Sequence, residues 1–236
     1  MSKIATLAIA ALFSVAGAAN ATVLSTFAKD YSGSVTEAAK YTLAKPDTDG
    51  ITVDFSFRFT PTTTQNLPDE LENNDFLGFW FNNSTGPSIG LKANCSTGTC
   101  TNDVFVRLGG TEGLYLANSD LDENTNYRVF GYLYKSSNST VYNNFDAWLN
   151  PTAYEMQTLT GADVHATSTM RLAGTNSAKS ITSVGFRSAN LDHGVVVSVK
   201  DVNLNVDAVP VPEPGSLALM GLAMAGLAAA RRRKQA

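Results

Sequence analysis

The sequence predicts an all-β fold, an antiparallel β-sandwich of the jelly-roll type, flanked by an N-terminal signal peptide and a C-terminal transmembrane helix. Three observations support this organisation. Residues 51–59 alternate between apolar and polar side chains, many short apolar stretches are separated by turn-forming residues, and both chain ends are apolar. The 236 residues fit one domain of ordinary size with short additions at its ends.

The first 21 residues have the organisation of a secretory signal peptide. Lys3 supplies a positive charge, residues 4–15 are apolar, and Ala19 and Ala21 form an A-x-A site for signal peptidase. The apolar run is too short to cross a bilayer as a stable helix. We therefore expect export, cleavage after Ala21 and a mature sandwich domain over residues 22–207.

The strongest strand pattern in this domain covers residues 51–59. Its odd-numbered side chains, from Ile51 to Phe59, are apolar, and its even-numbered side chains are polar, as in a strand with one buried face. Further strands are predicted at 76–82, 88–92, 104–108, 114–117, 127–135, 145–149, 181–187 and 195–206. Residues 152–179 lack a clear pattern and are expected to form long loops, and no amphipathic helix is evident in the domain.

The last predicted strand changes phase halfway along. Its apolar residues are odd-numbered up to Val199 and even-numbered from Val202 onward. Because side chains alternate strictly along a strand, both sets face one side only if one extra residue is inserted. We predict a β-bulge near Lys200 and Asp201; the alternative is a strand that is covered on both faces.

The two cysteines, Cys95 and Cys100, are too few for a tetrahedral zinc site. In an exported chain, such a pair is expected to form a disulfide that closes a small loop. The segment between the signal peptide and the tail contains 12 basic and 20 acidic side chains. This acidic balance argues against binding to nucleic acid, which needs a basic face.

Residues 208–236 form a distinct tail. It contains Pro212, Glu213 and Pro214, which favour an extended backbone, and continues with an apolar helix predicted at 215–230. The basic residues that follow would hold this end in the cytoplasm. These are Arg231, Arg232, Arg233 and Lys234.

This order of features closely resembles the PEP-CTERM sorting signal of Gram-negative bacteria. The resemblance implies recognition by exosortase, a membrane-embedded enzyme, and removal of the tail. The protein would be anchored transiently in the inner membrane and then reach the cell surface or the extracellular space. A permanent membrane anchor at the tail is the alternative.

The domain itself resembles a concanavalin A-like, laminin-G-like sandwich. The resemblance rests on residues 76–81, 88–91, 124–130 and 145–151, and on the closing strands within 184–204. It implies a lectin-like domain. Aromatic rings stack on the apolar faces of sugars, so four residues are candidates for glycan binding, although packing in the core would also explain them. They are Trp80, Tyr132, Tyr134 and Trp148.

The best oxygen-rich cluster for a metal contains Asp120 and Asp122. It begins like a calcium-binding loop but lacks the glycine and the glutamate of an EF-hand. No cofactor is therefore expected, with calcium at these aspartates as a possibility that the lectin-like resemblance leaves open. The alternative role of the two aspartates is to cap the turn before Tyr127.

We find no arrangement typical of a catalyst. A G-x-S-x-G nucleophile motif is absent, and His165 and His193 are expected in solvated loops. The acidic stretch 70–75 has the wrong order for a glucan hydrolase and is expected to be a polar loop. The sequence thus predicts a non-catalytic protein of the cell surface or the extracellular polysaccharide. The alternatives are a glycoside hydrolase on the same fold and a purely structural component of a biofilm matrix.

Overall fold

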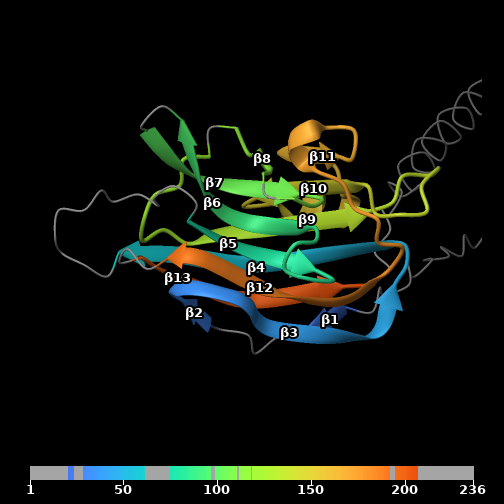
Figure 1. Cartoon of the computed structure of the whole chain (residues 1–236), viewed down its shortest axis with the longest axis horizontal. Helices are drawn as coiled ribbons and strands as arrows, with labels where there is room; N and C mark the ends of the chain where they lie inside the picture. The colour runs from blue at the N-terminus through green and yellow to red at the C-terminus, as the bar shows by residue number, and fades with distance from the viewer. Residues whose placement is uncertain are drawn as a thin grey trace, which may run out of the picture.

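The computed structural model describes residues 21–23, 29–61, 75–96, 99–110, 112–117, 119–191 and 195–206. Within these residues, the chain forms two antiparallel β-sheets that pack against each other (Figure 1). The predicted fold class, an antiparallel all-β sandwich, is confirmed.

Seven strands form the first sheet. They are β1 (Ala21–Val23), β2 (Lys29–Tyr31), β4 (Gly50–Pro61), β9 (Tyr127–Tyr134), β10 (Asn144–Leu149), β11 (Val164–Thr167) and β13 (Val195–Asn205). The order across the sheet is β1-β13-β4-β9-β10-β11, and β2 also pairs with β13. Strands β4 and β13, which are far apart in the sequence, are therefore neighbours.

Six strands form the second sheet. They are β3 (Gly33–Asp47), β5 (Phe76–Phe81), β6 (Ser88–Ser96), β7 (Thr99–Arg107), β8 (Leu114–Tyr115) and β12 (Ile181–Leu191). The order is β3-β12-β5-β6-β7-β8, which places the long strand β3 at one edge. All nine predicted strands have a counterpart in one of the two sheets, with differences of a few residues at their ends.

The core lies between the two sheets and is rich in phenylalanine. Phe55 of β4 stacks on Phe79 of β5 at 6.1 Å between ring centroids and meets the edge of Phe186 of β12 at 5.6 Å. All three side chains are at most 1% exposed. The alternating apolar residues of β4 therefore join the sheets, and its polar residues are left on the outer face of the seven-stranded sheet.

Residues 152–179 were expected to form long loops. The structure shows that they also contain short helices and a strand. They include helix α1 (Ala153–Thr158), strand β11 and the 3-10 helix η1 (Arg171–Ala173). Helix α1 begins with a capping box, because the Thr152 hydroxyl accepts from the Glu155 backbone N–H and the Glu155 carboxylate accepts from the Thr152 backbone N–H. The Glu155 carboxylate accepts hydrogen bonds from both the backbone N–H and the hydroxyl of Thr152, and these bonds keep the pKa of Glu155 below its usual range.

The predicted bulge in the last strand is confirmed. Lys200 pairs with Ser56 of β4, and the next pair joins Asn203 to Asp54, so three steps on β13 oppose two on β4. Asp201 takes a positive φ of 55° at this point. The extra residue lets the valines before and after it reach the same core, because Val199 and Val202 are both fully buried.

The predicted disulfide is also confirmed. Cys95 and Cys100 are directly opposite each other on β6 and β7, with their Cα atoms 4.0 Å apart. Together with the hydrogen-bonded ladder of the two strands, the bond closes the tip of this hairpin.

Removal of the disulfide, by Cys95→Ser together with Cys100→Ser, is expected to lower the free energy of unfolding by about 2 kcal/mol. The closed loop is short, so the disulfide restricts the unfolded chain only modestly. Urea unfolding of the variant and of the wild-type protein under oxidising conditions measures the difference. The remaining pairs between β6 and β7 should keep the variant folded, and a variant that no longer folds would contradict this expectation.

Both ends of the chain lie largely outside the described residues. The signal-peptide prediction falls on residues 1–20, and β1 begins at Ala21, one residue before the predicted mature start. The whole predicted tail, 208–236, is likewise outside them. Among the residues that are described, no helix has the length and apolar character needed to cross a membrane.

Candidate functional site

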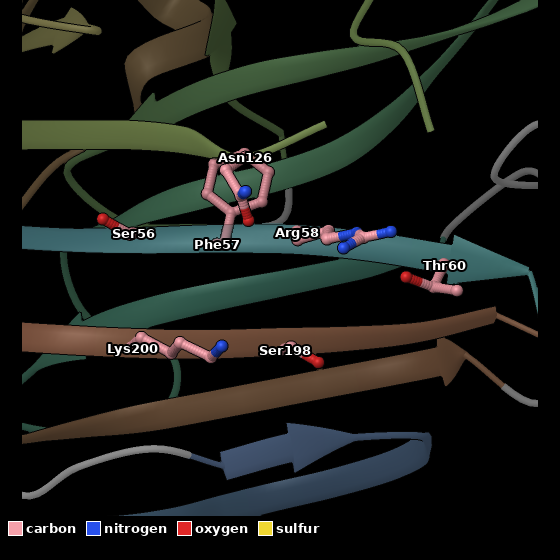
Figure 2. Close-up of a pocket in the computed structure, with 7 residues that line it drawn as sticks. All are labelled: Ser56, Phe57, Arg58, Thr60, Asn126, Ser198 and Lys200. Atoms are coloured by element: carbon pink, nitrogen blue, oxygen red, sulfur yellow. The ribbon is translucent and has the colours of Figure 1, made fainter. Parts of the chain in front are cut away.

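A hollow of about 220 Å³ opens on the outer face of the seven-stranded sheet. It lies over the neighbouring strands β4 and β13 (Figure 2). Its lining consists of Ser56, Phe57, Arg58, Thr60, Asn126, Ser198 and Lys200. The volume is below the range of about 300–1,000 Å³ that is common for pockets of drug-sized ligands, so the hollow fits a group of about the size of one sugar ring.

The register of the two strands explains why these side chains meet. Ser56, Arg58 and Thr60 alternate along β4 with core residues and therefore point away from the core. Across the ladder, Ser198 is opposite Arg58, and Lys200 is opposite Ser56. Lys200 reaches the outer face just before the bulge, which ends the regular pairing at this place.

The lining combines two cationic groups with several hydrogen-bonding groups. Arg58 donates from Nη2 to the side-chain oxygen of Asn124 at 3.2 Å. The Lys200 ammonium makes no hydrogen bond or ion pair with any residue that the structure describes. Among the residues lining the hollow, none carries a carboxyl group. Such a surface is suited to a ligand that has several hydroxyl groups or a negative charge.

Two acidic groups near the hollow, Asp54 and Asp30, already have partners. Asp54 accepts two hydrogen bonds from Arg128, at 2.8 and 2.6 Å, and these bonds raise the pKa of Arg128. Asp30 accepts from the Ser198 hydroxyl at 2.5 Å. The Arg128–Asp54 pair lies in β9 and β4, beside Ser56 in the ladder. It separates the hollow from a second polar cluster on the same face.

We call this second group the tyrosine–histidine cluster: Tyr132, Tyr134, Asp146 and His165. The rings of Tyr132 and Tyr134 stack with centroids 4.5 Å apart and planes 10° from parallel. Nδ1 of His165 contacts a carboxylate oxygen of Asp146, because β11 pairs with β10 in the register that places these two residues opposite each other. His165 was expected in a solvated loop; it lies on an edge strand instead, although its side chain is 46% exposed.

The ionisation of the tyrosines in this cluster follows from their surroundings. Burial, followed by the nearby Asp47 and Asp146, raises the pKa of Tyr132 to about 12. Burial and the carboxylate of Asp146 also raise the pKa of Tyr134 well above its usual range. Both phenols therefore stay protonated near neutral pH.

The four aromatic candidates for glycan binding do not form one site. Trp148 is 1% exposed under residues of the α1 region, including Met156, and its Nε1 donates to the Thr160 carbonyl at 3.0 Å. Trp80 belongs to the other sheet and lies against Gly185. Neither indole offers a free face to a sugar in this structure. Tyr132 is also buried, and Tyr134 is the most accessible of the four.

The two metal candidates have other contacts. A carboxylate oxygen of Asp120 accepts from the Asn102 backbone N–H at 3.1 Å, and the Asp122 backbone N–H donates to the Tyr127 hydroxyl at 2.9 Å. The first contact joins Asp120 to β7, and the second is made by the backbone of Asp122, so neither shows an aspartate carboxylate capping the turn before Tyr127. Within the described part of the chain, no group of three or more residues with His, Cys, Asp or Glu side chains could hold a metal ion.

Sequence reasoning did not identify the hollow. The outward direction of Ser56 and Arg58 follows from the alternation in residues 51–59. The contribution of Ser198 and Lys200 depends on the pairing of β13 with β4, which no local pattern indicates. The pairing of His165 with Asp146 was missed for the same reason, since it needs the register of β11.

Together, these features define a β-sandwich protein with a polar outer face on one sheet. Its sorting signal can be named: residues 210–234 match the PEP-CTERM protein-sorting motif. The resemblance of the tail is thereby confirmed. PEP-CTERM signals mark proteins that are exported and anchored at the membrane before processing, and the motif implies processing by exosortase. Curated protein sequences give no match to the chain.

Solved structures similar to this chain are β-sandwiches from proteins with different activities. The alginate lyase Aly36B, in a mutant complexed with alginate trisaccharide, is 12% identical with a TM-score of 0.47, over 77% of this chain and 81% of its own. The Emp47p carbohydrate recognition domain is 8% identical with a TM-score of 0.43, over 77% and 89%. A β-1,3-glucanase from Mycobacterium marinum is 10% identical with a TM-score of 0.39, over 76% and 72%.

Proposed function

We propose that the chain is a non-catalytic glycan-binding protein of the cell surface or extracellular matrix, and that exosortase removes its tail. The observation that carries the binding part is the hollow over β4 and β13. Its hydroxyl, amide and cationic groups lie side by side on an open face, as ring hydroxyls of a sugar would require. The processing part rests on the sorting motif at residues 210–234.

The small number of carboxyl groups in the hollow and in the tyrosine–histidine cluster supports binding rather than glycoside hydrolysis. Hydrolysis of this kind uses two carboxyl groups on opposite sides of the bond to be cleaved, about 5–10 Å apart. The lining of the hollow contributes none, and the tyrosine–histidine cluster contributes Asp146 alone. Asp146 and His165 are nevertheless residue types used in acid–base chemistry, and they support the alternative of a carbohydrate-active enzyme.

A binding assay with the purified mature protein tests this function. The protein is expected to retain some members of a panel of immobilised polysaccharides and to release neither reducing ends nor unsaturated sugars from them. Release of products would support the enzyme instead. If no polysaccharide in the panel is bound, a structural matrix component without a glycan ligand becomes the better account.

Intact-mass analysis of the secreted protein tests processing at both ends. We expect the mature form to begin at Thr22 and to lack everything beyond about Pro212, and we expect the tail to be retained in cells without exosortase. The measurement is decisive because a secreted protein with the tail and one without it differ clearly in mass. A secreted wild-type protein that still carries the Arg231–Ala236 end would contradict processing.

A further inference from the structure

The charge of the hollow differs from that of the domain around it. Between the signal peptide and the tail, acidic side chains exceed basic ones by 20 to 12. In the hollow, by contrast, the only charged lining residues are Arg58 and Lys200. At physiological ionic strength, exposed charges farther away than about 8 Å are largely screened. A ligand in the hollow is therefore acted on mainly by the charges close to it, and among the lining residues these are Arg58 and Lys200.

None of the nearest acidic side chains, Asp54, Asp30 and Asp201, forms an ion pair with Arg58 or Lys200 among the contacts of the described residues. Asp54 is held by two hydrogen bonds to Arg128, and Asp30 accepts from Ser198. Asp201 follows Lys200 in the bulge, is exposed and acts on the charge of Arg128. Lys200 itself has no partner among the described residues, so its ammonium remains available to a ligand.

The geometry allows both cations to reach one anionic group. Arg58 is opposite Ser198 and Lys200 is opposite Ser56, so the two cationic residues are diagonal neighbours on adjacent strands. Diagonal neighbours of an antiparallel pair are about 7–8 Å apart, which long side chains bridge. Figure 2 shows both side chains on the same face, with the hydroxyls of Ser56, Thr60 and Ser198 around them.

We propose that the hollow binds a carboxylate-bearing sugar unit of an acidic polysaccharide, such as a polyuronate. This inference rests on the proposed glycan-binding function and names its ligand class. Arg58 and Lys200 hold the carboxylate, and the hydroxyls and the Asn126 amide bind the ring hydroxyls. The size of the hollow limits the recognised unit to about one sugar residue within a longer chain.

The test compares polygalacturonate with dextran, a neutral glucan, in calorimetric titrations of the mature protein. The double variant Arg58→Gln/Lys200→Gln removes both cations. The control Arg171→Gln/Lys179→Gln removes the same charge from exposed residues outside the hollow. We expect the first variant to bind polygalacturonate about tenfold more weakly and the control to bind within about twofold of the wild type. Raising the salt from 0.05 to 0.5 M should weaken wild-type binding as well.

Each other outcome has a defined meaning. If dextran binds as tightly as polygalacturonate, the acidic ligand is refuted while glycan binding stands. If neither binds, and no other glycan does, the proposed function itself fails. An equal loss of binding in the control variant would show a general charge effect and would overturn the inference. Equally tight binding of double-stranded DNA would show that the hollow does not select polysaccharide and would overturn it as well. Thermal melts of all variants check that the fold is retained.

Discussion

Replacement of Gly90 by alanine is expected to destabilise the sandwich by about 3 kcal/mol or more. Gly90 lies on β6, directly opposite Gly78 of β5. A Cβ atom at this position would be 2.0 Å from the Leu77 carbonyl oxygen and 2.9 Å from the Gly78 Cα. Both are backbone atoms of the neighbouring strand, so relief of the clash requires the two strands to separate.

Gly78→Ala provides a matched control in the same pair of residues. The nearest atom to its added Cβ is Cζ of the Phe105 ring, at 3.3 Å. A side chain can shift by a few tenths of an ångström, and the expected loss is about 1 kcal/mol or less. Urea unfolding of both variants gives the two free energies. Equal stability of Gly90→Ala and Gly78→Ala would contradict the close approach of β5 and β6.

The strands that could be predicted are those whose side chains sort cleanly into a core face and an outer face. Strand β4 is the clearest case, because its alternate residues from Ile51 to Phe59 are all buried. The bulge in β13 was predictable for the same reason, since its two sets of apolar residues must reach one core. Burial of one face requires apolar residues at alternate positions, and this alternation allows the strand to be predicted from the sequence.

Strand β3 was missed because it lacks such a face. Among the β3 side chains whose exposure the structure describes, only Leu43 and Asp47 are buried, and the pairing of β3 with β12 contains four register shifts. Pro46 is tolerated because β3 is an edge strand. Helix α1 is different, since Thr152 and Glu155 form a capping box that the sequence displays. The start of that helix could have been predicted from the capping-box sequence at residues 152–155.

The hollow could be predicted only in part, because it depends on long-range pairing. The sequence places Arg58 and Ser56 on the outer face of a strand, and the phase change of β13 places Lys200 at a bulge. What it does not contain is the register that brings β13 beside β4. Local patterns determine the direction of a side chain, whereas the neighbours of that side chain follow from the topology of the whole sheet.

Alkaline pH is expected to unfold the domain steeply between about pH 10 and pH 12. Burial raises the pKa of Tyr31, Tyr132 and Tyr134, to about 12 for Tyr132. An unfolded tyrosine loses its proton near pH 10, so above this pH the unfolded state binds fewer protons than the folded state. The free energy of unfolding then falls by at most about 1.4 kcal/mol per pH unit for each tyrosine, and by less for Tyr134, which is only partly buried and therefore partly screened by solvent. Below pH 10 their contribution is fully present.

Tyr31→Phe separates this effect from general alkaline damage. The Tyr31 hydroxyl is buried and has no hydrogen-bond partner in the part of the chain that the structure describes, so its removal should leave stability at pH 7 unchanged or raise it by about 1 kcal/mol. Urea unfolding at several values between pH 9 and pH 12 gives the slope, which the variant should reduce by about one third. Parallel slopes for the variant and the wild type would mean that Tyr31 ionises as readily in the folded protein as in the unfolded chain. That result would contradict the burial of Tyr31 against Phe186, whose ring centroid is 5.5 Å from that of Tyr31.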